Sequence, residues 1–143
     1  MEEGVRILVA YDGSDESKKA VEEAKSIAEK FKGSIDVLNV YWDAKETQYE
    51  NTLARTENIT PSDEGSLRIL DDAEEILVKS GVNYTLRTVR DSDVAGAILR
   101  VVEEEGIDCI VMGSRGLGRS SALILGSVST SVIAKAECPV IVT

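Results

Sequence analysis

Histidine is absent from this sequence of 143 residues, and cysteine occurs only twice, at Cys109 and Cys138. Without histidine the chain cannot use Ser-His or Cys-His catalysis or imidazole acid–base chemistry, and without a Cys-x-x-Cys pair it lacks the common zinc sites. Both cysteines lie among apolar residues of strand type, so we expect reduced core side chains rather than a disulfide.

Basic residues are also scarce, because 16 Lys and Arg oppose 26 Asp and Glu and give a formal net charge of -10. A surface of this sign repels polyanions, which argues against a nucleic-acid partner. No apolar stretch approaches the ~20 residues of a membrane span. Glu2 and Glu3 stand where a signal peptide carries positive charge, so we expect a cytoplasmic protein without a membrane partner.

The composition that remains, 43% hydrophobic and 29% charged, is that of a globular protein. A domain of this length buries ~70% of the surface that its unfolded chain exposes. Residues 1–143 are therefore expected to form one domain whose core needs neither metal nor disulfide.

Apolar runs of strand type alternate along the chain with helical patterns. The predicted strands are 5–10, 35–42, 82–89, 107–112 and 139–142. The predicted helices follow Ser14, cover 67–77 and 94–102, and run from Ser127 to Ala136. The polar stretch from Asp43 to about Ser62 shows no apolar period and is expected to be a long, mobile loop.

Apolar residues recur at helical spacing after Ser14, and Gly33 is expected to end that helix. Its inward positions are predicted to be Ala20, Val21, Ala24, Ile27, Ala28 and Phe31. Asp93 is a ready cap for the third helix, and Gly106 closes it.

This alternation predicts an α/β fold, a doubly wound, Rossmann-like parallel sheet of five strands with helices on both faces. With strand order 3-2-1-4-5 the winding reverses between the first and fourth strands, and ligands of such folds bind beyond the carboxyl ends of the strands at that point. The segments 10–14 and 113–118 then face each other across a crevice. Ala10, Tyr11 and Asp12 are candidate site residues on the first of them.

Glycines cluster after the fourth strand, at Gly113, Gly116, Gly118 and Gly126, and Ser127 opens the last helix. Glycines let backbone N–H groups approach an anion, and a helix N-terminus adds partial positive charge, so the pattern suits a phosphate. The pattern is neither a Walker A loop nor the dinucleotide fingerprint G-x-G-x-x-G. A surface loop with turn glycines is the alternative reading.

Three stretches together resemble the universal stress protein family. They are the string Gly113-x2-Gly116-x9-Gly126-Ser127, the segment Val9-Ala10-Tyr11-Asp12-Gly13-Ser14, and the ending Val132 to Val140. The resemblance spans the chain and implies the strand order 3-2-1-4-5. The glycine spacing is similar to that of the ATP-binding branch of the family, as opposed to the branch that lacks the motif.

By resemblance, Asp12 lies near the ribose and phosphates and Val40 meets the adenine edge through its backbone. The remaining implied contacts are Met112, Gly113, Arg115 and Gly116 along the nucleotide, and Gly126, Ser127 and Val128 at the phosphates. The expected ligand is ATP, or AMP or ADP, with Mg²⁺ bound through the phosphates and near Asp12. Alternatively, Asp12 is a turn or capping residue, Ser127 only an N-cap, and Arg115 a solvated charge.

The expected function is therefore a nucleotide-binding regulatory module of the stress response. A slow ATP-hydrolysing or phosphoryl-transfer enzyme that uses the same pocket is the alternative, and the sequence offers it neither a histidine base nor a Walker lysine. A dinucleotide or flavin carrier and an acidic adaptor with an empty pocket are further alternatives. Segment 139–143 carries no charge and lies at a sheet edge, which together with the resemblance predicts a homodimer through this strand. Its downstream protein partner is unknown.

Overall fold

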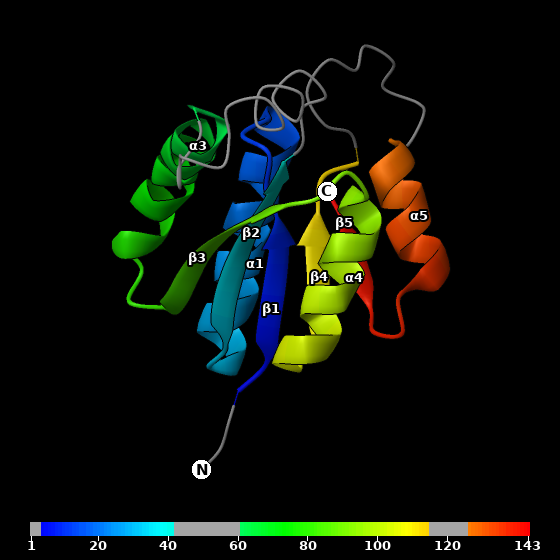
Figure 1. Cartoon of the computed structure of the whole chain (residues 1–143). Coiled ribbons are helices and arrows are strands. Elements are labelled where there is room, and N and C mark those ends of the chain that lie inside the picture. Colours follow the sequence, from blue (N-terminus) through cyan, green and yellow to red (C-terminus); the bar gives the residue numbers. More distant parts are fainter. Residues whose placement is uncertain (1–3, 42–60, 115–125) are drawn as a thin grey trace.

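The computed structural model describes residues 4–41, 61–114 and 126–143, except the side chains of residues 61–67. Strands and helices alternate along these residues, as the sequence predicts (Figure 1). The elements, labelled as in Figure 1, are β1 (Arg6–Ala10), α1 (Asp15–Phe31), β2 (Ser34–Tyr41), α3 (Pro61–Val78), β3 (Asn83–Arg90), α4 (Val94–Glu105), β4 (Cys109–Met112), α5 (Ser127–Lys135) and β5 (Val140–Val142).

The five strands form one parallel sheet in the order β3-β2-β1-β4-β5, which confirms the predicted topology. Central β1 pairs with β2 from Arg6 opposite Ser34 and with β4 from Ile7 opposite Cys109. Consecutive strands therefore step outward to β3, and the chain then returns to the other side of β1. All carboxyl ends of the strands lie at one end of the sheet (Figure 1).

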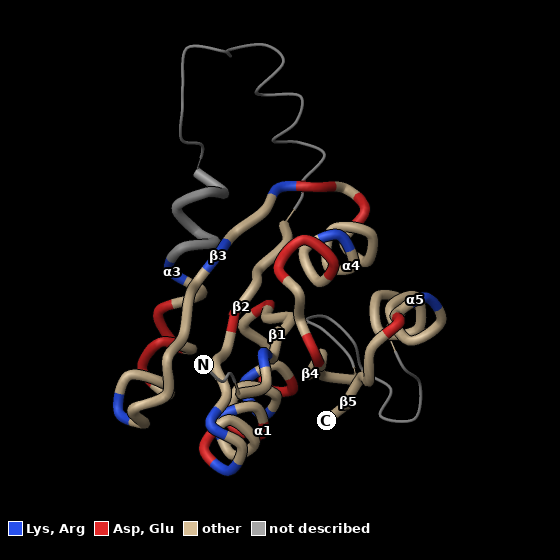
Figure 2. The backbone as a smooth tube through the Cα atoms, turned by 90° about the horizontal axis from the view of Figure 1, so that it is seen from below, with Lys and Arg blue, Asp and Glu red and all other residues tan. Residues whose placement is uncertain are grey.

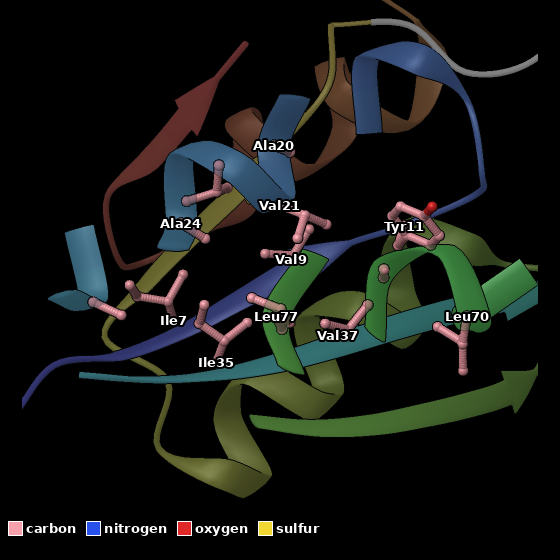
Figure 3. Close-up of a cluster of buried hydrophobic side chains, with 13 residues drawn as sticks. Ile7, Val9, Tyr11, Ala20, Val21, Ala24, Ile35, Val37, Leu70 and Leu77 are labelled. Atoms are coloured by element: carbon pink, nitrogen blue, oxygen red, sulfur yellow. The ribbon is translucent and has the colours of Figure 1, made fainter. Parts of the chain in front are cut away.

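Helices cover both faces of the sheet, as predicted, because side chains of successive strand residues point to opposite faces. Ile7, Val9 and Val37 pack with α1 and α3 in one core layer (Figure 3). Leu8, Leu38 and neighbouring residues of β4 pack with α4 and α5 in the other layer. No helix among the described residues combines the length and the apolar composition that a membrane span needs.

The end of α1 differs from its prediction in two residues. Lys32, not Gly33, adopts the left-handed conformation after the helix, with φ of 56°. Gly33 is needed for a close approach instead, because a Cβ there would lie 2.5 Å from the carbonyl oxygen of Val5. Phe31 was predicted to face the core, but it is 63% exposed because it lies in the last turn of the helix, at the rim of the layer.

Two other elements, α3 and β4, begin at residues that differ from the predicted ones. Helix α3 already begins at Pro61, inside the stretch expected to be a loop, and proline is well suited to the first turn of a helix. The rest of that stretch, residues 42–60, lies outside the described residues. Strand β4 begins at Cys109 rather than Ile107, because the N–H of Ile107 donates to the carbonyl oxygen of Val102 at 3.0 Å and so closes α4.

The two cysteines are free and half-buried, as the sequence predicted. Burial raises the pKa of the thiol at Cys109 and at Cys138. Both side chains therefore behave as small packing groups of the sheet.

Charged residues are unevenly distributed over the layers (Figure 2). Helix α1 carries many charges of both signs, whereas α5 carries only Lys135 and β5 carries none. At the amino end of the sheet Arg6 pairs with Asp36 at 3.2 Å, and Arg87 pairs with Glu105 at 3.1 Å. Arg87 belongs to the edge strand β3, so one sheet edge bears charge and the other does not.

Leu77 and Val78 are sequence neighbours at the end of α3, and they test the core assignment. Leu77 is fully buried, whereas Val78 is 59% exposed. We expect Leu77→Ala to lower the free energy of unfolding by about 2–5 kcal/mol through lost packing. The matched change Val78→Ala should alter it by about 0.5 kcal/mol or less. Urea unfolding measures both, and equal losses would contradict the packing of α3 described here.

Candidate functional site

A cavity of about 300 Å³ opens beyond the carboxyl ends of β1, β2 and β4, where the winding reverses. Its described lining residues come from these three strands, from the turns that follow β1 and β4, and from α1, α4 and α5 with its N-cap. They are Ala10, Tyr11, Asp12, Ser17, Leu38, Val40, Val94, Ile98, Met112, Gly113, Gly126, Ser127, Val128 and Ser129. The position is the one expected for a doubly wound sheet.

Most of the predicted site residues meet at this cavity. Those that line it are Ala10, Tyr11, Asp12, Val40, Met112, Gly113, Gly126, Ser127 and Val128. Arg115 and Gly116 lie outside the described residues, so the structure does not place them. Two segments more than a hundred residues apart in the chain thus share one hollow.

Sequence reasoning missed several lining residues. They are Ser17, Leu38, Val94, Ile98 and Ser129. Val94 and Ile98 belong to the predicted helix 94–102, but the sequence does not say which positions of that helix border a hollow. Their place directly after the Asp93 cap, at the helix end nearest the strand ends, is the signal that could have identified them.

The cavity has an apolar wall and a polar end. Leu38, Ile98 and Met112 are buried core residues that form part of the wall together with Val40 and Val94. Asp12, Ser17 and the start of α5 form the polar part. Ligand pockets of this kind hold a flat apolar group on one side and place polar groups on the other.

The first turn of α5 receives no capping bond from the side chain of its N-cap residue, which is a glycine. Its N-cap is Gly126, with extended backbone (φ -69°, ψ 163°), so Ser127 is the first helical residue and the N-cap reading of Ser127 is wrong. In α1 and α4, by contrast, the side chains of Ser14 and Asp93 accept from first-turn N–H groups. First-turn N–H groups without a capping side chain, beside a cavity, attract an anion because the helix dipole adds partial positive charge there.

Gly113 is required by packing, which differs from the reason that the sequence suggested. A Cβ at Gly113 would lie 2.6 Å from the Cβ of Glu16, so α1 crosses the end of β4 in direct contact with the glycine. The carbonyl oxygen of Gly113 accepts from the Ser129 hydroxyl at 2.8 Å. Gly113 therefore joins α1, β4 and α5 at the cavity.

Asp12 has the local role of a turn residue and also lines the cavity. Its Oδ1 accepts from the N–H of Ser14 at 2.9 Å, and Gly13 follows with φ of 86°. The turn reading and the ligand reading of Asp12 are thus compatible. Among the described residues no three potential metal-ligating side chains of His, Cys, Asp or Glu gather, so a cation here would need oxygen atoms of the ligand.

The universal stress protein family model matches residues 5–143. The chain belongs to this family. A universal stress protein of Thermus aquaticus, described by its place in the 3′ region of a QAH/OAS sulfhydrylase, is 34% identical over 139 residues, which covers 94% of this chain and 95% of the relative.

Solved structures of similar fold agree with this membership. The protein MJ0577 superimposes with a TM-score of 0.80 at 25% identity and covers 97% of this chain and 94% of its own. A universal stress protein in complex with cAMP superimposes with a TM-score of 0.69 at 22% identity, and the match covers 99% of this chain and 98% of that one. At that identity the second likeness is one of fold.

In this universal stress protein Tyr11 borders the cavity, but its side chain points into the hydrophobic core. The ring packs in the layer of α1 and α3, near Leu70, and is 2% exposed (Figure 3). Its hydroxyl is buried without a hydrogen-bond partner among the described residues. The amide of Asn39 donates to the backbone carbonyl of Tyr11 at 2.8 Å, so the main chain of Tyr11 borders the cavity in a fixed position.

The buried hydroxyl makes Tyr11 a spectroscopic reporter. Burial, with smaller contributions from Asp72 and Asp12, raises the pKa of Tyr11 from 10.0 to about 12. An unfolded chain therefore releases this proton first, and the free energy of unfolding should fall between pH 10 and pH 12, by roughly 2–3 kcal/mol in full. Urea unfolding at several pH values measures the fall.

Tyr11→Phe should make that fall shallower and remove the contribution of Tyr11 to the late tyrosinate signal in an ultraviolet titration. It should cost little stability at pH 7, because it removes a hydroxyl that has no partner among the described residues. Tyr84→Phe is measured in parallel, because the Tyr84 hydroxyl donates to Glu74 at 2.7 Å and this bond raises the pKa of Tyr84 as well. A late signal that Tyr84→Phe keeps and the double variant Tyr11→Phe/Tyr84→Phe loses belongs to Tyr11, and its persistence in the double variant would contradict this assignment.

Proposed function

We propose that this universal stress protein binds an adenine mononucleotide, ATP in the first place, and acts as a nucleotide-binding regulatory module of the stress response. The observation that carries the proposal is the start of α5, whose N-cap is a glycine without a capping side chain and which borders the polar end of a cavity with an apolar wall. One cavity thus offers an apolar surface for the base of a nucleotide and a polar surface for its phosphates.

The apolar wall suits the base. Val40, Val94 and Ile98 offer aliphatic surface to a flat ring, and backbone groups at the end of β2 suit the polar edge of adenine. A volume of about 300 Å³ is at the small end for ligand sites, which favours a mononucleotide over a flavin or dinucleotide. The solved relative with cAMP carries an adenine mononucleotide on the same fold.

The polar end suits the phosphates. Gly126, Ser127 and Val128 begin α5, and Arg115 and Gly116 are proposed to complete the anion contacts. Mg²⁺ would be held through phosphate oxygens with help from the Asp12 carboxylate, a ligand set of the kind that Mg²⁺ takes. The cation would offset the negative charge of the phosphates, and the protein groups would orient the phosphates.

Binding is favoured over turnover. Asp12 is the one carboxylate among the described lining residues, and no lysine or arginine stands among them. Phosphoryl transfer needs positioned cations and a residue that orients the nucleophile. Any hydrolysis is therefore expected to run well below the ~1–100 s⁻¹ that is typical of kinases.

MgATP should stabilise the nucleotide-free protein. At a concentration ~100-fold above the dissociation constant it should add ~2.7 kcal/mol, which raises the melting temperature by roughly 5–15 °C. Gly126→Val should abolish the shift, because its side chain would occupy the place of a phosphate while φ of -69° tolerates a branched residue.

Thr85→Val, on the far edge strand β3, is the control and should keep the full shift. The experiment needs protein shown by mass spectrometry to carry no nucleotide. Absence of a shift in the parent would refute nucleotide binding. If MgATP raised the melting temperature of Gly126→Val as much as that of the parent, the nucleotide would have to bind at another site.

We also propose that β5 pairs with its copy in a second subunit. Pro139 donates no hydrogen bond, its carbonyl accepts from Ile110, and Thr143 both donates to Met112 and accepts from Ser114. Alternation along the strand then directs the N–H and C=O groups of Val140 and Val142 away from β4, toward the free edge. This edge has no charge to prevent pairing, unlike β3 with its Arg87 (Figure 2).

Val142→Pro tests the dimer without touching the β4 ladder. Proline removes an outward N–H, so light scattering at tens of micromolar should move from the dimer mass to the monomer mass. Val142→Ala keeps the N–H and should stay dimeric. A monomeric parent, or a Val142→Pro variant that remains dimeric, would rule out pairing through this edge.

A further inference from the structure

One peptide unit at the end of β5 connects the free sheet edge to the cavity. The C=O of Val142 points outward, and the N–H of Thr143, which belongs to the same planar trans peptide, donates to the carbonyl oxygen of Met112 at 2.9 Å. Met112 lines the cavity. A bond accepted at the edge and a bond donated toward the cavity therefore share one rigid group.

A second route leads from the same residue to the start of α5. The carbonyl oxygen of Thr143 accepts from the N–H of Ser114 at 3.0 Å, and the carbonyl oxygen of Ser114 accepts from the N–H of Gly126 at 2.7 Å. Gly126 is the N-cap at the polar end of the cavity. Thr143 is thus hydrogen-bonded directly to Met112 in the apolar wall of the cavity and, through Ser114, to Gly126 at its polar end.

The Thr143 side chain adds a contact to α1. Its hydroxyl donates to the carbonyl oxygen of Glu16 at 3.2 Å, next to the point where α1 meets Gly113. The edge strand, the end of β4 and the starts of α1 and α5 are therefore tied together around Thr143. Ordering any one of these segments restrains the others.

We propose that nucleotide binding in the cavity and pairing of two subunits through β5 are positively linked, with Thr143 as the connecting residue. The inference rests on the proposed function, both for the nucleotide and for the β5 pairing. A ligand at the start of α5 and a partner strand at β5 hold the same hydrogen-bonded junction in place. The second event therefore has less chain to order than the first.

The test measures the dimer dissociation constant of nucleotide-free protein by sedimentation, with no nucleotide and with saturating MgATP. We expect MgATP to tighten the dimer at least ~5-fold. Linkage is reciprocal and each dimer has two nucleotide sites, so the monomeric variant Val142→Pro should bind MgATP more weakly than the dimeric parent by about the square root of that factor, at least ~2-fold per site, in calorimetry. Val142→Ala should bind like the parent.

Two substitutions at Thr143 separate the backbone hydrogen bond to Met112 from the contact of the side-chain hydroxyl with Glu16. Thr143→Pro removes the N–H that donates to Met112 and should reduce the effect of MgATP on the dimer to less than ~2-fold. Thr143→Val keeps both backbone bonds and loses only the hydroxyl contact with Glu16, so it should retain most of the linkage. Circular dichroism shows whether each variant is folded.

The outcomes distinguish this inference from the function on which it rests. If MgATP binds and the parent dimer has the same dissociation constant with and without it, the linkage is refuted and the nucleotide site stands. If MgATP does not bind, or if the parent is monomeric throughout, the linkage fails together with that part of the proposed function. Full linkage in folded Thr143→Pro would overturn the role of Thr143. The parent measurement decides the proposal even if Thr143→Pro does not fold.

Discussion

The pairing of β1 with β4 is the contact on which the rest of this structure depends. It brings the second half of the chain back to the centre of the sheet, with Ala10 opposite Met112 at the carboxyl ends. A strand that returned to the outside of β3 would bury as many apolar side chains, but it would leave the segments after β1 and β4 at opposite edges. The reversal alone places Asp12 and Gly126 around the same hollow.

Gly113 makes that arrangement tight. Because α1 crosses the end of β4 at Glu16 with no room for a Cβ, the turn after β1 and the turn after β4 are held against each other. The carbonyl of Gly113 also receives the Ser129 hydroxyl, which ties down the first turns of α5. A glycine whose sequence pattern suggests an anion-binding loop thus acts as a packing contact between α1, β4 and α5.

An acidic protein can still present a local site for an anion. The net charge of -10 is spread over helices and turns, and at physiological ionic strength charges more than about 8 Å apart are largely screened. The start of α5, with glycine as its N-cap, lies directly at the cavity, so its partial positive charge acts at short range. In the proposed complex a bound cation would further offset the charge of the phosphates.

Local patterns were sufficient for the elements and for much of the site. Short apolar runs, capping residues such as Ser14 and Asp93, and the alternation of the two periods predict a doubly wound parallel sheet, because right-handed crossovers leave few ways to connect such elements. The order 3-2-1-4-5 itself was implied by the resemblance to the universal stress protein family, and the structure confirms it. The predicted lining residues on both sides of the reversal follow from the ends of β1 and β4.

Tertiary packing alone decided the remaining features. Phe31 has the apolar spacing of a core residue, yet its helix ends at the rim of the layer. Val94 and Ile98 border the cavity because of where α4 crosses the strand ends. The purpose of Gly113 and the bonds of Thr143 depend on contacts between residues about a hundred positions apart, such as that between Gly113 and Glu16. A local pattern states which residues are apolar, polar or small, but such distances between elements arise only when the layers pack against one another.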